Sequence, residues 1–116
     1  MKPIILLFAA IFGLLTFSDN NKNIEGTWLL QTNDSLCSKT VIRIQMNEGI
    51  WEGKMDIPEQ EIYDKEIWSI KVDKDNVLIT AFKNGSTISG KMINDSTITG
   101  QMKIDSNVDP VMLKKI

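Results

Sequence analysis

The side chains that most often carry catalysis are scarce in this sequence. It contains no histidine and a single cysteine, Cys37. Without histidine there is no Ser-His-Asp or Cys-His arrangement, and most zinc and copper sites lose their usual ligand. The chain also lacks a G-x-S-x-G turn, a glycine-rich phosphate loop and a CxxC pair. We therefore predict no catalytic residue, no metal and no cofactor, and a protein that is not an enzyme.

Carboxylates gather in one stretch, Asp56–Glu66, which holds five of them. Such a group could offer oxygen ligands to Ca²⁺, or the pair of acids that glycoside hydrolysis requires, with Glu59 and Glu61 as the candidates. The spacing does not match an EF-hand, so the favoured interpretation is a solvated loop. Asp73–Asn76 also begins like a calcium loop but lacks the glycine and the distal glutamate, and a hairpin turn explains it.

Large apolar side chains offer a different kind of site. Trp28, Trp51 and Trp68 occupy apolar positions of three expected strands, and methionines occur at similar positions. Aromatic and methionine surfaces adapt to apolar ligands, but the interior of a small barrel can also be filled by its own side chains. If a ligand pocket exists, we expect its wall to consist of Trp28, Trp51, Trp68, Met55 and Met102.

The elements that would position these side chains are strands, because apolar and polar residues alternate with a period of two and no long helical period occurs. Asn, Asp and Gly, which tolerate the positive φ of tight hairpins, separate the runs. Short connections make successive strands antiparallel. The expected strands are Glu25–Thr32, Lys39–Met46, Ile50–Ile57, Glu66–Asp73, Val77–Phe82, Ser86–Ile93, Thr97–Ile104 and Val111–Ile116.

A weak repeat supports this pattern, because three segments share an apolar-x-Gly-x-Met core: Trp51–Met55, Ile88–Met92 and Ile98–Met102. Alternation places the apolar residue, the glycine and the methionine of each segment on one face of the sheet. Inward glycines permit sharp coiling and leave room for a bulky side chain opposite. The predicted fold class is all-β: an eight-stranded antiparallel up-and-down barrel, with a two-sheet sandwich as its rival.

The N-terminus has the order of a secretory signal peptide. Lys2 precedes an uncharged apolar run, Pro3–Phe17, which is shorter than the roughly 20 residues of a membrane-spanning helix. The alternatives are a buried N-terminal helix or an uncleaved anchor. We expect residues 1–18 to form a signal-peptide helix, residues 19–24 a polar spacer and residues 25–116 the barrel domain, exported to the periplasm or beyond.

Two properties of the exported part bound its partners. Without Lys2, 12 basic residues stand against 15 acidic ones, a net charge of −3 with no basic cluster. Binding to nucleic acid or to an anionic membrane surface therefore has no electrostatic support. We also expect no stable membrane insertion after signal cleavage. Cys37 has no partner for an internal disulfide, so we interpret it as a small buried hydrophobe, with an intermolecular disulfide or a reactive thiol as the alternative.

The start of the first expected strand, Gly26-Thr27-Trp28, resembles the Gly-x-Trp signature of lipocalins and other calycins. That resemblance implies a tryptophan packed across the closed end of a barrel. It also implies a basic partner from the last strand, for which Lys114 and Lys115 are available.

The wider pattern is similar to small exported lipocalin-like domains that stand in front of bacterial secreted α/β-hydrolases. The segments that carry this similarity are Gly26–Trp28, Met55–Gln60, Ile88–Met92, Asp95–Gly100 and Pro110–Lys115. No hydrolase domain follows in this sequence, so no catalytic residue is carried over. The resemblance implies a non-catalytic module that binds a small apolar ligand or a partner protein. The alternatives are an accessory subunit docking on a separate secreted hydrolase and, more distantly, a carboxylate-based hydrolase.

Overall fold

A computed structural model describes residues 21–83 and 85–116 of the chain. The predicted signal peptide, residues 1–18, and the first two residues of the predicted spacer lie outside the described residues. Within the described residues, no helix is both long and apolar enough to cross a bilayer.

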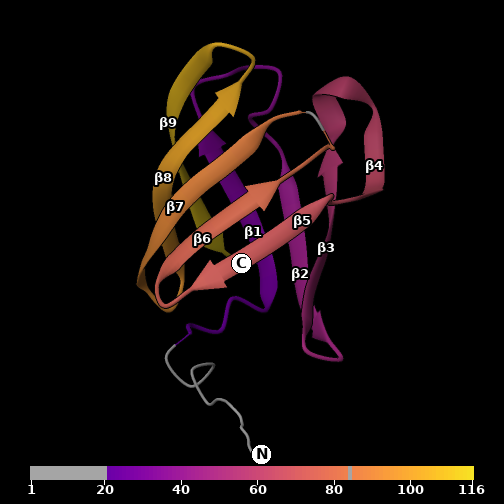
Figure 1. Ribbon diagram of the computed structural model, residues 1–116. Coiled ribbons are helices and arrows are strands. Elements are labelled where there is room, and N and C mark those ends of the chain that lie inside the picture. Colours follow the sequence, from indigo (N-terminus) through magenta and orange to yellow (C-terminus); the bar gives the residue numbers. More distant parts are fainter. Residues whose placement is uncertain (1–20, 84) are drawn as a thin grey trace, which may run out of the picture.

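Nine antiparallel strands make one sheet across the part of the chain that the structure describes, and they confirm the all-β prediction (Figure 1). The sheet order is β4-β3-β2-β1-β9-β8-β7-β6-β5. One turn of 3₁₀ helix, η4 (Pro58–Gln60), interrupts the meander. The strands are β1 (Gly26–Thr32), β2 (Val41–Asn47), β3 (Ile50–Ile57), β4 (Ile62–Glu66), β5 (Ser69–Asp73), β6 (Asn76–Thr80), β7 (Thr87–Asn94), β8 (Thr97–Ile104) and β9 (Asn107–Lys115).

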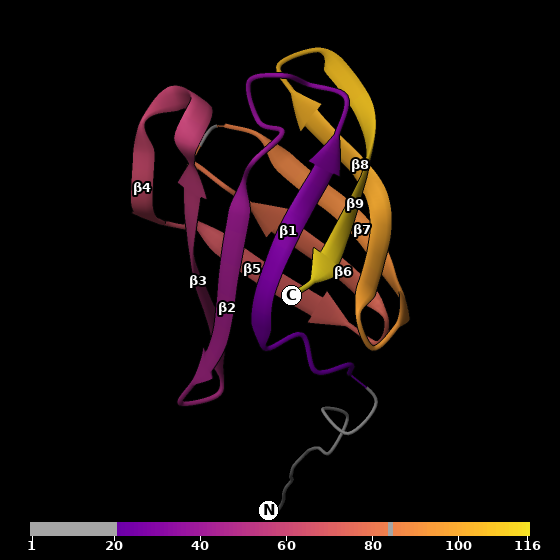
Figure 2. The ribbon, with the colours of Figure 1, turned by 180° about the vertical axis from the view of Figure 1, so that it is seen from behind.

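The sheet curls until its two halves face each other. Strands β5 to β7 lie in front of β1 to β3 in Figure 1, and the order is reversed in the opposite view of Figure 2. The first and last strands pair with each other, as an up-and-down barrel requires. The ring is nevertheless interrupted between β4 and β5, which are the two ends of the sheet. The predicted closed eight-stranded barrel is therefore wrong, and the domain is an open half-barrel of nine strands.

The extra strand β4 explains the failure to close. It lies in the stretch predicted to be a loop, and it pairs with Lys54–Ile57, the C-terminal half of β3. Glu61, in the left-handed conformation at φ 57°, reverses the chain after η4 so that this pairing is possible. Because β4 covers that edge of β3, the bond to β3 at Gly53 comes from the segment that joins β4 to β5, where the Ile67 N–H donates to the Gly53 carbonyl at 2.9 Å, and β5 does not pair with β3 in the described sheet. The strand predicted at Glu66–Asp73 consequently begins at Ser69.

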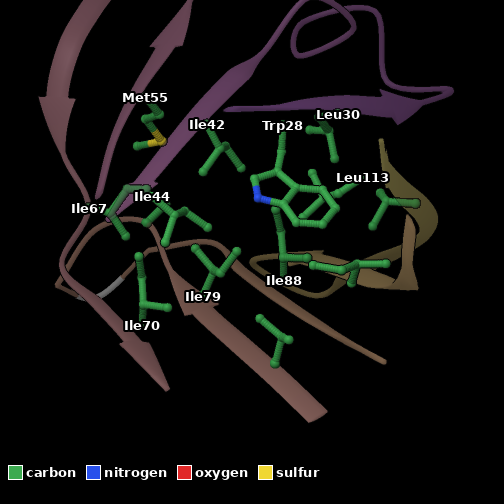
Figure 3. Close-up of a cluster of buried hydrophobic side chains, with 14 of the residues drawn as sticks. Trp28, Leu30, Ile42, Ile44, Met55, Ile67, Ile70, Ile79, Ile88 and Leu113 are labelled. Atoms are coloured by element: carbon green, nitrogen blue, oxygen red, sulfur yellow. The ribbon is translucent and has the colours of Figure 1, made fainter. Parts of the chain in front are cut away.

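The core lies between the two facing halves of the sheet. Trp28 and Leu113 are completely buried at its centre, and Ile88 and Ile79 reach them from the opposite half (Figure 3). The inward positions predicted from the repeat are confirmed, because the apolar residue and the methionine of the second and third segments are buried. The buried apolar side chains are Ile24, Trp28, Leu30, Cys37, Ile42, Ile44, Met55, Ile57, Ile67, Ile70, Val77, Ile79, Ala81, Ile88, Met92, Ile98, Met102, Val111 and Leu113.

Two opposed glycines let two neighbouring strands approach closely. Gly90 of β7 lies directly opposite Gly100 of β8. A Cβ on Gly100 would collide with the Ser89 carbonyl oxygen and with the Gly90 Cα, which are both backbone atoms that cannot turn aside. A side chain is therefore excluded here, and the backbones of β7 and β8 approach closely.

Gly100→Ala should lower the free energy of unfolding by about 1–3 kcal/mol, the usual cost of overpacking a tight site. Urea denaturation followed by tryptophan fluorescence measures this change. Gln101→Ala, at the neighbouring exposed position, is the control and should stay within about 0.5 kcal/mol of the wild type. Equal stability of the two variants would show that the close approach of β7 and β8 does not exist.

Candidate functional site

A cleft opens where β3 and β5 diverge, and it is the candidate binding site. Its volume is about 560 Å³. One wall is the N-terminal half of β3 with the adjoining part of β2, and the other is the segment that joins β4 to β5. We call it the β3–β5 cleft. It is lined by Arg43, Ile44, Gln45, Ile50, Trp51, Glu52, Gly53, Lys54, Glu66, Ile67 and Trp68.

Two tryptophans line this cleft, one on each wall. Trp51 of β3 is half-buried and packs against the core, whereas Trp68 is 58% exposed. The Lys83 ammonium lies 5.7 Å from the centroid of the Trp68 ring, within the range of a cation–π contact. Ile50, beside Trp51, is 64% exposed. Charged side chains, among them Glu52, Lys54 and Glu66, also line the cleft, so exposed apolar surface lies beside polar groups there.

The structure separates the five residues that the sequence suggested as a pocket wall. Trp51 and Trp68 line the β3–β5 cleft. Trp28, Met55 and Met102 are instead packed in the core, with no more than 4% of any of them exposed. The sequence reasoning missed Ile50 and Ile67. Adjacent apolar residues at Ile67-Trp68 break the alternation of the expected strand, and this signal could have shown that the chain leaves the sheet there.

Trp28 is fully buried in the core and does not line the cleft. Its Nε1 donates to the Ile24 carbonyl oxygen at 3.0 Å, and the Lys115 ammonium lies 5.1 Å from the centroid of its ring. The predicted contact with a lysine of the last strand is thus confirmed for Lys115. Lys114 instead donates to the Thr97 hydroxyl at 3.3 Å. Trp28 and Lys115 together join the first and last strands.

An ion-pair network occupies the stretch in which carboxylates are concentrated. The Arg43 guanidinium donates to Asp56 at 2.8 and 3.3 Å and to Asp64 at 2.7 Å. The Asp64 N–H also donates to the Asp56 carboxylate at 2.7 Å. These hydrogen bonds, with Arg43 the larger contributor, hold the pKa of Asp56 below its usual value. The network links β2, β3 and β4 and so stabilises the pairing that keeps the sheet open.

One further carboxylate of this stretch, that of Glu59, is also hydrogen-bonded. The Ser38 hydroxyl donates to the Glu59 carboxylate at 2.7 Å, and this bond lowers the pKa of Glu59. Among the described residues, no cluster of three or more His, Cys, Asp or Glu side chains has an arrangement that could hold a metal ion.

Cys37 is buried, and only 6% of it is exposed. Burial, with smaller contributions from the nearby charges of Asp34 and Glu59, raises the pKa of its thiol. The Gln60 amide nitrogen lies 3.8 Å from the sulfur. A protonated, enclosed thiol is a poor nucleophile, so these surroundings favour a packing role.

Comparison of the chain with protein-family models, with curated proteins and with solved structures finds no match.

Asp56→Asn should destabilise the domain at neutral pH, because the substitution removes the charge that Arg43 binds. A carboxyl whose pKa is lowered by folding contributes stability above its unfolded pKa, and that contribution is lost as the pH falls through the folded pKa. The difference in urea midpoint between wild type and variant should therefore be largest near pH 7 and shrink below about pH 4. Asp95→Asn, an exposed site away from Arg43, is the control. A difference that does not depend on pH would argue against the network.

Cys37 should react slowly with 5,5′-dithiobis(2-nitrobenzoate) in the native protein at pH 8 and rapidly in urea, because unfolding exposes the thiol and restores its ordinary pKa. Absorbance at the wavelength of the released thiolate measures both rates. Equal rates in the native and unfolded states would mean that the Cys37 thiol is accessible to the reagent in the native protein and is not buried.

Proposed function

We propose that this protein is a non-catalytic binding module that takes an apolar group into the β3–β5 cleft. The observation that carries the proposal is that Trp51 and the exposed Trp68 lie on the two walls of one cleft. Concave sites with aromatic walls and a few polar groups are the usual form of ligand sites. Large apolar side chains that remain exposed in a group commonly mark a binding surface.

The residues around the cleft support binding more than catalysis. The sequence has no histidine to act as a general base near neutral pH. Arg43, which lines the cleft, is engaged by Asp56 and Asp64. A module of this kind needs no cofactor.

A lipocalin-like relationship is part of the proposal. Its support is the Gly26-Thr27-Trp28 opening, the Lys115 ammonium over the Trp28 ring and a meander whose first and last strands pair. In this interpretation the domain is a lipocalin-like sheet in which β4 has prevented closure, and ligand binding has moved from a closed interior to the cleft at the interruption.

Export completes the proposed setting. The charge-apolar-polar order of residues 1–18 supports a secretion signal, and we propose that the domain acts in the periplasm or outside the cell. Since Cys37 cannot form a disulfide within the chain, packing of the core must hold the fold in an oxidising compartment.

A second candidate is an accessory subunit that docks on a separate secreted hydrolase. The observation that favours it is the exposure of Ile50 and Trp68 at the mouth of the cleft, where they could contact a protein surface. Co-purification of a defined hydrolase, lost on Trp68→Ala, would distinguish it from small-ligand binding.

Binding of 1-anilinonaphthalene-8-sulfonate tests the apolar cleft directly. We expect saturable binding with energy transfer from tryptophan, and a Kd raised about tenfold or more in Trp51→Ala/Trp68→Ala, since a lost contact of about 1.4 kcal/mol is a factor of ten. Tyr63→Ala is the matched control, because Tyr63 is 64% exposed but lies outside the cleft lining. Equal affinity in the double variant, or no saturable binding by the wild type, would contradict the proposal.

A further inference from the structure

One half of β3 has a neighbouring strand on one side only. β2 pairs with β3 from Ile50 to Asp56, whereas β4 pairs with β3 only from Lys54 onward. On that side the segment Ile50–Gly53 therefore pairs with no strand of the described sheet, and its one bond there is from the Ile67 N–H to the Gly53 carbonyl. The same four residues line the β3–β5 cleft, so the free edge forms one of its walls.

The backbone groups of this edge point into the cleft. In an antiparallel pair, residues alternate between those whose N–H and C=O bond the partner strand and those whose N–H and C=O point away. The Gly53 carbonyl accepts from the Ile67 N–H at 2.9 Å, so Gly53 belongs to the residues that point away from β2. Trp51, two residues earlier, points the same way. The N–H and C=O of Trp51 and the N–H of Gly53 are thus directed toward the cleft.

Apolar side chains flank these backbone groups. Trp51 lies on the same strand, and Ile67 and Trp68 lie on the opposite wall. Donors and acceptors spaced at two-residue intervals match the backbone of another extended chain, whereas a small apolar molecule would leave them without partners. Recognition by strand addition combines main-chain hydrogen bonds with contacts to alternate side chains of the added strand.

We propose that the occupant of the β3–β5 cleft is an extended polypeptide segment that adds to β3 along Ile50–Gly53. Its apolar side chains, at every second position, pack between Trp51 and Trp68. The added strand lies between β3 and β5 and fills the interruption in the half-barrel. This inference rests on the proposed binding function and names the class of its partner.

Selection from a displayed library of random dodecapeptides on the wild-type domain supplies the probe. We compare the affinity of the selected peptides for Trp51→Ala and Trp51→Pro, which both lack the indole. Only the proline variant also lacks the N–H that points into the cleft, and proline is tolerated where that N–H bonds no strand. We expect peptides to bind Trp51→Pro about five- to tenfold more weakly than Trp51→Ala. Near-UV circular dichroism of the remaining tryptophans, Trp28 and Trp68, checks that both variants fold.

N-methylation of the selected peptides gives a second test that leaves the protein unchanged. A strand that adds to one edge uses the N–H of every second residue, so methylation should abolish binding at alternate positions and be tolerated between them. This alternation would support the proposal even if Trp51→Pro fails to fold.

Three results would overturn the inference. The first is that the selection recovers no peptide. The second is that selected peptides bind the two Trp51 variants with equal affinity and that N-methylation shows no alternation. The third is that the wild type self-associates and Trp51→Pro abolishes this, which would assign the edge to a second copy of the chain. If 1-anilinonaphthalene-8-sulfonate still binds in the cleft, only the identity of the partner is wrong. If it does not, the proposed binding function fails as well.

Discussion

The pairing of β4 with the C-terminal half of β3 determines the shape of this protein. A meander whose first and last strands pair would close into a barrel if β5 could bond along β3. β4 already occupies that edge from Lys54 to Ile57, the segment after β4 bonds β3 only through the Ile67 N–H to the Gly53 carbonyl, and β5 does not pair with β3 in the described sheet. The open half-barrel, the cleft and the free edge of β3 all follow from this one competition between two strands for the same edge.

The rest of the domain buries its core although the sheet is interrupted between β4 and β5. Trp28 is fully buried and joins the first and last strands through Lys115, so the middle of the sheet does not depend on closure. The opposed glycines Gly90 and Gly100 let β7 and β8 approach closely, and the two halves of the sheet share one core. Because that core is buried without the missing contact, the edge beside Trp51 can remain available to another molecule. The binding site we propose thus lies at the point where the fold is incomplete.

Local sequence patterns were sufficient for most strands and for the side chains that face inward. In Ile88–Met92 and Ile98–Met102, the alternation of apolar and polar residues predicted both the strand and its inward-facing side chains. The same reasoning failed at β4, because a proline and several carboxylates favour a loop when only neighbouring residues are considered. Arg43, distant in the sequence, forms ion pairs with Asp56 and Asp64 that favour the pairing of β4, and no pattern of neighbouring residues indicates them. Trp68 was predicted to lie within a strand that begins at Glu66. In the structure β4 ends at Glu66, and Trp68 lies in the connection before β5, where its side chain is exposed.

Amide hydrogen exchange measured by NMR tests the open edge most directly. If β3 is unpaired along the cleft, the Trp51 N–H should exchange rapidly, while the Glu52 N–H, which faces β2, and the Ile67 N–H, bonded to Gly53, should be protected. Protection of the Trp51 amide equal to that of Glu52 would mean that the barrel closes in solution and would contradict the account.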